Sequence, residues 1–140
     1  MKGDYGVRAL VELAHHFGEG PVQSAVIANR QSIPEAYLDQ LLTSLRRAGF
    51  IRSVRGPQGG HALVRDPHGL RLSEAVGALE GSLAPIGCLD TPDGCPKTSS
   101  CCLRSVWQEI EDATLRILEG ITIADLAERE RAGNVARYAI

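Results

Sequence analysis

The sequence predicts a mainly α-helical protein with one small β-hairpin and a long helix in its C-terminal half. Three observations support this prediction. Apolar residues recur at the helical spacing of three and four positions along much of the 140-residue chain. A glycine-rich segment, residues 56–60, interrupts that spacing between two short β-prone runs. A helical stripe returns after a segment without periodicity that carries the cysteines.

The N-terminal half is predicted to begin with three helices, of which the second is short and covers about residues 24–30. The first helix is ended by glycines and a proline, and its apolar face comprises Leu10, Leu13, Ala14 and Phe17. The third is predicted to be opened by Ser32 and Glu35, which have capping-box spacing, and to end at Gly49. Its apolar face comprises Leu38, Leu41, Leu42 and Leu45.

A β-hairpin and a further short helix are predicted next. Two β-prone runs, residues 51–54 and 62–64, flank the glycine-rich segment, which is typical of a hairpin. Residues 66–69 indicate a turn. Ser73 is then expected to cap a helix that ends near Glu80.

The C-terminal half is predicted to hold a long loop, a long helix and a tail. Residues 81–100 contain three prolines and three glycines without periodicity, which predicts a loop. The helix beyond it carries an apolar stripe that the small N-terminal helices cannot cover, so we interpret it as a dimerisation helix. The stripe comprises Val106, Ile110, Ala113, Ile117 and Ile121. Residues 125–140 are predicted to form a helical turn and a charged, frayed tail.

Three helices followed by an arginine-flanked hairpin have the element order of a winged helix-turn-helix. We therefore predict a winged helix-turn-helix DNA-binding domain over residues 1–80. A cysteine-bearing loop would cover residues 81–103, and the dimerisation helix with its tail would cover residues 104–140.

Composition and charge argue against several kinds of protein. A hydrophobic share of 44% and a net charge of −2 are typical of a globular chain. An aromatic share of 4% argues against a stacking platform for single-stranded nucleic acid. Asp4 and Arg8 interrupt what would be the apolar core of a signal peptide, and no run is long enough for a membrane helix, so we expect a cytoplasmic protein. The chain has no catalytic triad order, phosphate loop or dinucleotide motif, so we expect no enzyme.

The charge is unevenly distributed, with a net +2 over residues 1–70 and a net −4 over residues 71–140. Five arginines of the first part follow one another without an intervening acidic residue: Arg46, Arg47, Arg52, Arg55 and Arg65. Such a strip is typical of a nucleic-acid footprint, although an ordinary solvated face has the same composition.

The third helix has the right size for the major groove of B-DNA, and a glycine-rich hairpin suits backbone and minor-groove contact. We expect base contacts from the polar face of this helix, from Tyr37, Asp39, Gln40 and Thr43. Wing contacts are expected from Arg55, Gln58 and Gly59, and phosphate contacts from Arg46, Arg47 and Arg52. His61, which follows the wing, is a further candidate for phosphate contact. The alternative is a helical domain whose hairpin only covers the core.

The four cysteines, Cys88, Cys95, Cys101 and Cys102, lie within fifteen residues. Gaps of six and five residues do not match the short knuckles of structural zinc sites, and adjacent cysteines form disulfides only with strain. A wide loop of thiolates is typical of an iron–sulfur cluster, which we favour. A thiol redox switch, a zinc site and the absence of any special role remain alternatives.

The chain resembles the Rrf-two (Rrf2) family of bacterial regulators in several segments. These are residues 2–9 (KGDYGVRA), 37–42 (YLDQLL), 54–60 (VRGPQGG), the cysteine loop and 103–107 (LRSVW). The resemblance covers nearly the whole chain. It implies a homodimeric winged-helix protein that binds double-stranded DNA and that often carries a 2Fe-2S or 4Fe-4S cluster.

The resemblance also implies a set of metal ligands. The three cysteine ligands of the family fall on Cys88, Cys95 and Cys101, which leaves Cys102 at a non-ligand position. In IscR-like members the fourth ligand is a histidine three residues after the third cysteine, where this chain has Arg104, which cannot ligate. In NsrR-like members it is an N-terminal aspartate of the partner subunit, and Asp4 matches that position. Asp4 is equally suited to be a helix N-cap.

Three functional hypotheses follow. The first is a homodimeric transcription factor whose cluster senses iron–sulfur, redox or nitric oxide status and thereby sets DNA affinity. The second is a cluster-free regulator of the same fold, implied by the CymR-like branch, which acts through thiol oxidation or a partner protein. The third is an iron–sulfur or zinc module that carries electrons or scaffolds a partner without binding DNA.

Overall fold

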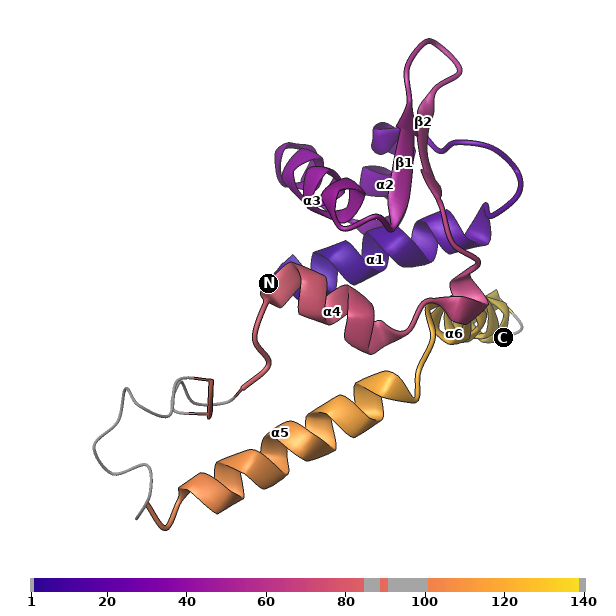
Figure 1. Cartoon of the computed structure of the whole chain (residues 1–140). Coiled ribbons are helices and arrows are strands. Elements are labelled where there is room, and N and C mark those ends of the chain that lie inside the picture. Colours follow the sequence, from indigo (N-terminus) through magenta and orange to yellow (C-terminus); the bar gives the residue numbers. More distant parts are fainter. Residues whose placement is uncertain (1, 85–88, 91–100, 139–140) are drawn as a thin grey trace.

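The computed structural model describes residues 2–84, 89–90 and 101–138 and confirms a mainly helical chain with one hairpin (Figure 1). Its elements are α1 (Lys2–His15), α2 (Ser24–Gln31), α3 (Glu35–Arg47), β1 (Ile51–Val54), β2 (Gly60–Leu63), the 3₁₀ turn η1 (Pro67–Gly69), α4 (Leu72–Glu80), α5 (Arg104–Glu119) and α6 (Ile123–Tyr138). No helix in these ranges is both long and apolar enough to cross a membrane.

The core forms around α1, against which α2, α3, α4 and α6 all pack. Seven large apolar side chains are less than 2% exposed: Leu10, Leu13, Ile27, Leu38, Leu45, Leu70 and Ile123. The predicted leucine face of α3 is confirmed, because all four of its leucines are buried. Burying a leucine side chain contributes about 2 kcal/mol, so this face fixes how α3 sits on α1. The polar face of α3 is thereby directed outward.

The hairpin is antiparallel and is joined to the segment before α2. Ser53 pairs with His61, and Arg52 pairs with Ala62. Val22 forms an isolated bridge with His61, with both backbone hydrogen bonds at 2.8 Å. Successive residues of a strand point to opposite faces, so Ser53 and Arg52 lie on different sides of the hairpin. Figure 1 shows the hairpin projecting beyond α2 and α3, as a wing does.

Two predicted features near the helix ends are wrong. Ser32 does not cap α3, because it ends α2 in the left-handed conformation at φ 55° with its N–H bonded to Ala28. Pro34 holds the N-cap position of α3 instead. Phe17 is 43% exposed rather than part of the first helix face, because α1 ends at His15.

The start of α4 differs from the prediction in the same way. The helix begins at Leu72, so Ser73 lies inside it rather than at its cap. The cap position belongs to Arg71, whose backbone N–H donates to Oε1 of Glu74 at 3.5 Å. Residues 67–69 form the 3₁₀ turn where a turn was expected.

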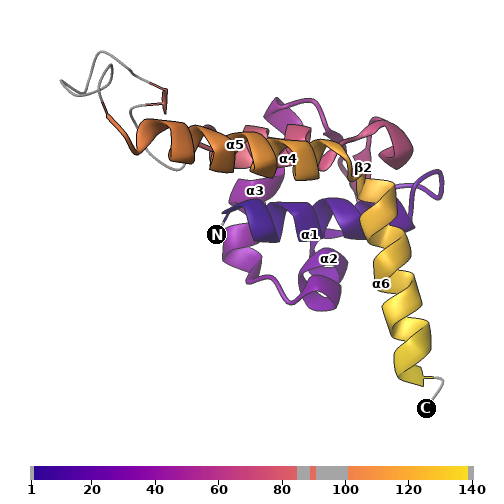
Figure 2. The same cartoon turned by 90° about the horizontal axis from the view of Figure 1, so that it is seen from below.

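The segment after α5 is a second long helix and not the predicted frayed tail. Ile123 and Ala127, one turn apart on α6, are almost fully buried, and α6 packs on α1. Figure 2 shows α5 running beside α4 and α6 leaving its end in a different direction. The sixteen residues of α5 include no buried one, so α5 lies on the outside of the described chain.

Candidate nucleic-acid interface and cysteine site

The outward face of α3 carries the four predicted base-contact residues, of which two are exposed. Asp39 and Gln40 are exposed. Tyr37 is only half-exposed, because its ring packs edge-on against Tyr5 with centroids 5.6 Å apart. Thr43 donates its hydroxyl to the backbone oxygen of Asp39 at 2.9 Å. Of the four predicted base contacts, Asp39 and Gln40 therefore have the fewest competing interactions.

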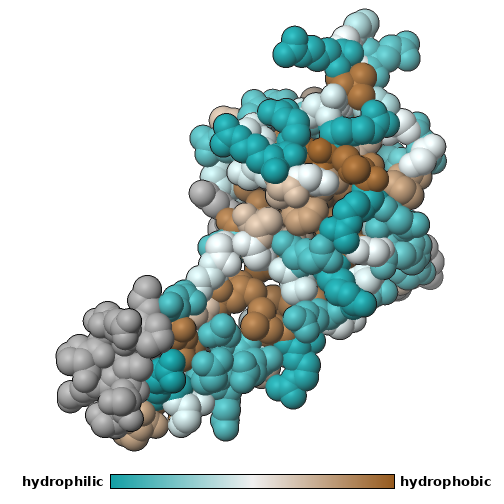
Figure 3. All heavy atoms as spheres, viewed as in Figure 1, coloured by the Kyte–Doolittle hydropathy of each residue, from teal (hydrophilic) through white to brown (hydrophobic). Residues whose placement is uncertain are grey.

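The tip of the hairpin carries the predicted wing residues. Arg55 and Gln58 are exposed there, and Figure 3 shows hydrophilic side chains over the tip. Gly59 is buried, and a Cβ at this position would collide with the backbone of Val54. Its N–H bonds to the Gly56 oxygen at 3.0 Å, so the structure gives Gly59 a role in forming the turn.

The predicted arginine strip is divided by the structure. Arg46 lies on the α3 side of the hairpin, where Nη1 donates to Oγ of Ser53 at 3.3 Å, and Arg47 is exposed on α3. Arg52 lines a different cleft, together with His16 and Phe17, behind the hairpin. The two phosphate candidates Arg46 and Arg52 are therefore not on one face.

Arg65 does not belong with the other arginines. Its Nη1 donates to Oε2 of Glu74 at 2.6 Å, and its Nη2 donates to the Gly69 oxygen at 2.7 Å. The hydrogen bond with Glu74 raises the pKa of Arg65, and the Arg65 guanidinium lowers the pKa of the Glu74 carboxyl. The charge of Arg65 is thus matched within the protein and adds little to an electropositive face.

Sequence reasoning missed two residues that join the wing to α2. Gln23 donates from Nε2 to the Pro57 oxygen at 3.4 Å, and Ser24 contacts the ring of His61 at 3.0 Å. Both contacts depend on the bridge between Val22 and His61, residues that are far apart in the sequence. No local pattern marks such a bridge.

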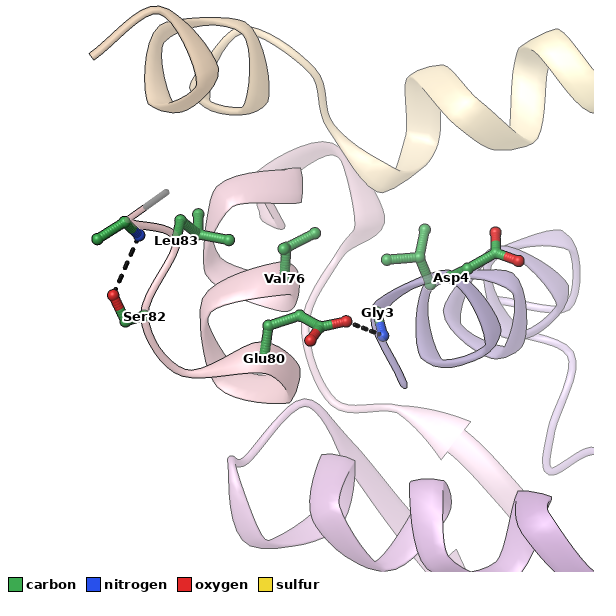
Figure 4. Close-up of a pocket in the computed structure, with 8 residues that line it drawn as sticks. Gly3, Asp4, Val76, Glu80, Ser82 and Leu83 are labelled. Atoms are coloured by element: carbon green, nitrogen blue, oxygen red, sulfur yellow. Dashed lines mark hydrogen bonds between the residues drawn. The ribbon is translucent and has the colours of Figure 1, made fainter. Parts of the chain in front are cut away.

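The second candidate region lies where α1 begins and α4 ends. An open cleft of about 430 Å³ lies there, and its lining includes Asp4, Val76, Glu80 and Leu83 (Figure 4). Asp4 is exposed and pairs with Arg8, with Oδ2 and Nη2 3.0 Å apart. The backbone N–H of Gly3 donates to Oε1 of Glu80 at 2.7 Å. This bond ties the start of α1 to the helix that leads into the cysteine loop.

The structure places two of the four cysteines. Cys101 is half-buried and Cys102 is exposed, directly before α5, while Cys88 and Cys95 lie outside the described residues. Arg104 opens α5, and its backbone N–H donates to the Cys101 oxygen at 3.4 Å. Within the described ranges alone, no three side chains of His, Cys, Asp or Glu come together as a metal site. The predicted ligand set is therefore only partly visible.

Comparison with known proteins places these features in a family. A family model described as Rrf2, an iron-dependent transcriptional regulator, matches residues 1–129. The regulator CymR of Bacillus subtilis is 35% identical over 126 residues, which is 90% of this chain and 86% of CymR. The regulator IscR of Xenorhabdus nematophila is 34% identical over 135 residues, which is 96% of this chain and 82% of IscR.

Solved structures agree with the sequence relatives. The structure of T. potens IscR has a TM-score of 0.73 at 39% identity and covers 93% of this chain and 85% of its own. The structure of CymR, titled the global cysteine regulator of B. subtilis, has a TM-score of 0.76 at 34% identity. It covers 92% of this chain and 95% of its own. The predicted winged helix-turn-helix architecture is thereby confirmed.

Proposed function

Because the chain belongs to the Rrf2 family of transcriptional regulators, we propose that it is a homodimeric DNA-binding regulator whose operator affinity is set by an iron–sulfur cluster. One observation carries the proposal: the exposed polar face of α3 lies beside a wing tipped with Arg55 and Gln58. This arrangement suits simultaneous contact with a major groove and the neighbouring backbone. The division into residues 1–80, 81–103 and 104–140 is part of the same proposal.

We assign base contacts to Asp39 and Gln40, with Tyr37 and Thr43 supporting them, and the wing contact to Arg55 and Gln58. A carboxylate such as that of Asp39 accepts a hydrogen bond from cytosine, and a glutamine amide matches adenine. A duplex selected from a random library supplies the probe for testing these contacts. Arg55→Ala should lower affinity about tenfold and reduce its salt dependence, whereas Gln40→Ala should change the preferred sequence. An Arg55→Ala protein with unchanged affinity at two salt concentrations would contradict the wing contact.

The proposed dimer is supported by an exposed apolar stripe on α5, which no other described part of the chain covers. Val106, Ile110 and Ile117 share one face of the helix, Leu103 continues this face at the N-cap, and the four side chains are between 43% and 63% exposed. An apolar stripe of this length on a helix outside the core is typical of a helix that packs against a second copy.

The dimer is tested by light scattering coupled to gel filtration. Ile110→Glu should shift the mass from that of two chains to that of one chain, because it buries a charge in the contact. Ser105→Glu places the same side chain on the other face of α5 and should leave the mass unchanged. Equal masses for the parent and both variants would argue against α5 as the interface.

The cluster is assigned to Cys88, Cys95 and Cys101, with Asp4 of the second copy as the fourth ligand. The residues that the structure describes fit this assignment: Cys101 is accessible beside the exposed thiol of Cys102, and the carboxylate of Asp4 is exposed on a cleft rim. Arg104 stands where a histidine ligand would be needed, which disfavours the other known arrangement. When bound, the cluster would supply a redox- and nitric-oxide-sensitive centre that orders the cysteine loop.

Matched cysteine variants test the cluster. The parent, purified without oxygen, should contain iron and acid-labile sulfide in equal amounts and absorb in the thiolate-to-iron region. Cys101→Ala should lose both, whereas Cys102→Ala, one residue away, should keep both. Asp4→Ala should lower iron retention without unfolding the chain. Zinc, or no metal in anaerobic preparations, would overturn the cluster assignment.

The second candidate is a thiol-based regulator of the same fold. It is favoured by one observation, the exposed thiol of Cys102 next to Cys101. A solved structure titled the oxidized form of Staphylococcus aureus CymR, at 31% identity and a TM-score of 0.72, gives an oxidised regulator a precedent within the family. Its signature would be DNA affinity that changes on mild oxidation in a metal-free protein and that becomes insensitive in Cys102→Ala.

A further inference from the structure

His61 lies where the hairpin meets both helices of the helix-turn-helix. Its backbone is bonded to Val22 in both directions. Its Nε2 lies 3.0 Å from Oγ of Ser24, the first residue of α2, and its Nδ1 lies 2.8 Å from Oγ of Ser53 on β1. Both ring nitrogens are therefore occupied by protein hydroxyls, and neither is free to bind a phosphate.

These contacts extend to α3 as a continuous chain of hydrogen bonds. Arg46 donates from Nη1 to Oγ of Ser53 at 3.3 Å. If the His61 ring is neutral and protonated on Nε2, each of these contacts has one donor and one acceptor. The Ser53 hydroxyl donates to Nδ1, and Nε2–H donates to Oγ of Ser24. All donors then point in one direction, an arrangement in which successive bonds strengthen each other.

Burial and one neighbouring cation favour this neutral form of the His61 ring. Burial and the cation of Arg46 lower the pKa of His61 below the ordinary 6.5 of an imidazole, and the carboxylate of Asp39 opposes them more weakly. The ring is thus neutral at physiological pH. A neutral imidazole held on both sides acts as a rigid cross-link between elements.

We propose that His61 is a positioning residue for DNA binding, which fixes the wing relative to α2 and α3 so that helix and wing meet one duplex together. The hairpin has only four residues in each strand, and an isolated two-stranded hairpin is marginally stable. If the hairpin is already held in its binding orientation, less conformational entropy is lost when the protein binds DNA. The proposal rests on the DNA-binding half of the proposed function and is independent of the cluster.

Three substitutions separate the two ring contacts. The amide of Asn reaches about as far as Nδ1, so His61→Asn retains a partner for Ser53 only. The longer His61→Gln retains a partner for Ser24 only, and His61→Ala retains neither. Affinity for the selected duplex should fall in all three, about tenfold in His61→Ala and less in the two amides. His68→Ala, at an exposed histidine far from the wing, is the matched control and should bind like the parent.

A double-mutant cycle distinguishes positioning from a general loss of stability. Because a misplaced wing has already lost its contact, His61→Ala and Arg55→Ala together should weaken binding by less than the product of their separate effects. The combination of His61→Ala with Gln40→Ala should weaken binding by the full product of the two separate effects, because Gln40 is on α3 and not on the wing. Thermal midpoints of all variants, measured at one protein concentration, identify any variant that fails to fold. If His61→Ala does not fold, the same double-mutant cycle is measured with His61→Asn and His61→Gln.

The pH dependence distinguishes positioning from phosphate contact. Under the proposal, the affinity ratio of parent to His61→Asn stays constant between pH 8.5 and pH 7.5, because a ring whose pKa lies below 6.5 is almost entirely neutral over that range. A ratio that grows as the pH falls would show a cationic His61 on phosphate and would overturn the proposal. Folded His61 variants that bind like the parent while Arg55→Ala binds weakly would also overturn it. If Arg55→Ala itself binds like the parent, the wing contact of the proposed function fails, and the positioning role fails with it.

Discussion

Single polar side chains connect α1 to the neighbouring helices α2 and α6. Glu12 of α1 is 2% exposed, and its carboxylate oxygens lie 2.9 Å from Nε2 of His16 and 3.1 Å from Nε2 of Gln31. Gln31 also donates to Oε1 of Glu130 at 3.2 Å. One buried carboxylate and one amide thus join α1, α2 and α6. The sequence places Glu12 inside the first helix and Glu19 between two glycines beyond it, but helical spacing alone does not show that Glu12 is buried or which partners its carboxylate meets.

Removing this carboxylate should be costly, since it leaves the buried amide of Gln31 with one acceptor fewer. We expect Glu12→Ala to lower the free energy of unfolding by about 2 kcal/mol. Glu19→Ala should change it by less than about 0.5 kcal/mol, because its carboxylate is exposed and lies 3.6 Å from Nδ1 of His16. Urea titrations at one protein concentration measure both. Equal effects would show that the Glu12 contacts contribute no net stability.

The lowered pKa of His61 also has a consequence for stability. The unfolded chain takes up a proton near pH 6.5, whereas the folded chain does so only at lower pH. The parent should therefore lose stability relative to His61→Gln as the pH falls below about 6.5, and the difference should become constant below the folded pKa. Thermal midpoints of the two proteins between pH 8 and pH 5 measure this difference. A stability difference that does not vary with pH would contradict the neutral ring.

At the scale of elements, the sequence predicts what depends on local spacing. The leucine face of α3 and the two strands follow directly from periodicity and from the glycine-rich turn. The predicted N-cap residue of α3 is wrong, because a serine such as Ser32 can end one helix as readily as it can cap the next. α6 was missed, although Thr122 and Asp125 form a reciprocal cap at its start. The many charges after it conceal the two apolar positions, Ile123 and Ala127, that α1 buries.

The cap of α6 can be tested by itself. The Thr122 hydroxyl accepts from the Asp125 N–H at 3.1 Å, and Oδ2 of Asp125 accepts from the Thr122 N–H at 2.9 Å. Thr122→Ala should lower the free energy of unfolding by about 1 kcal/mol. Ser105→Ala, an exposed serine of α5, should leave it nearly unchanged. Because α6 packs on α1, a weaker cap should lower the free energy of global unfolding. An unchanged free energy in Thr122→Ala would show that packing against α1, and not the cap, stabilises α6.

At the scale of the whole molecule, the cysteine loop connects two parts with different tasks. In the chain, the loop follows α4, whose end is bonded to the start of α1, and precedes α5, so it connects the N-terminal helices and wing to the proposed dimer contact. The candidate ligand Asp4 could be predicted only from resemblance. The bond between Gly3 and Glu80 could not, because it joins residues 77 positions apart. This bond is a direct link between the end of α4 and the helix on which α3 packs.

Gly3→Ala tests whether the joint between α1 and α4 transmits the state of the loop. A Cβ at Gly3 would lie 2.7 Å from Oε1 of Glu80, so the flexible carboxylate must move away and its bond to the backbone is lost. Because only a side-chain end moves, the fold should persist. We expect the ratio of operator affinities between cluster-loaded and cluster-free protein to shrink by about fivefold or more. Gly77→Ala, a helical glycine of α4 with nothing within 4 Å, should preserve the ratio. Anaerobic binding titrations of the cluster-loaded and cluster-free forms of each variant measure this ratio. An unchanged ratio in Gly3→Ala would show that the state of the loop is transmitted elsewhere, through the packing of α5 on α4.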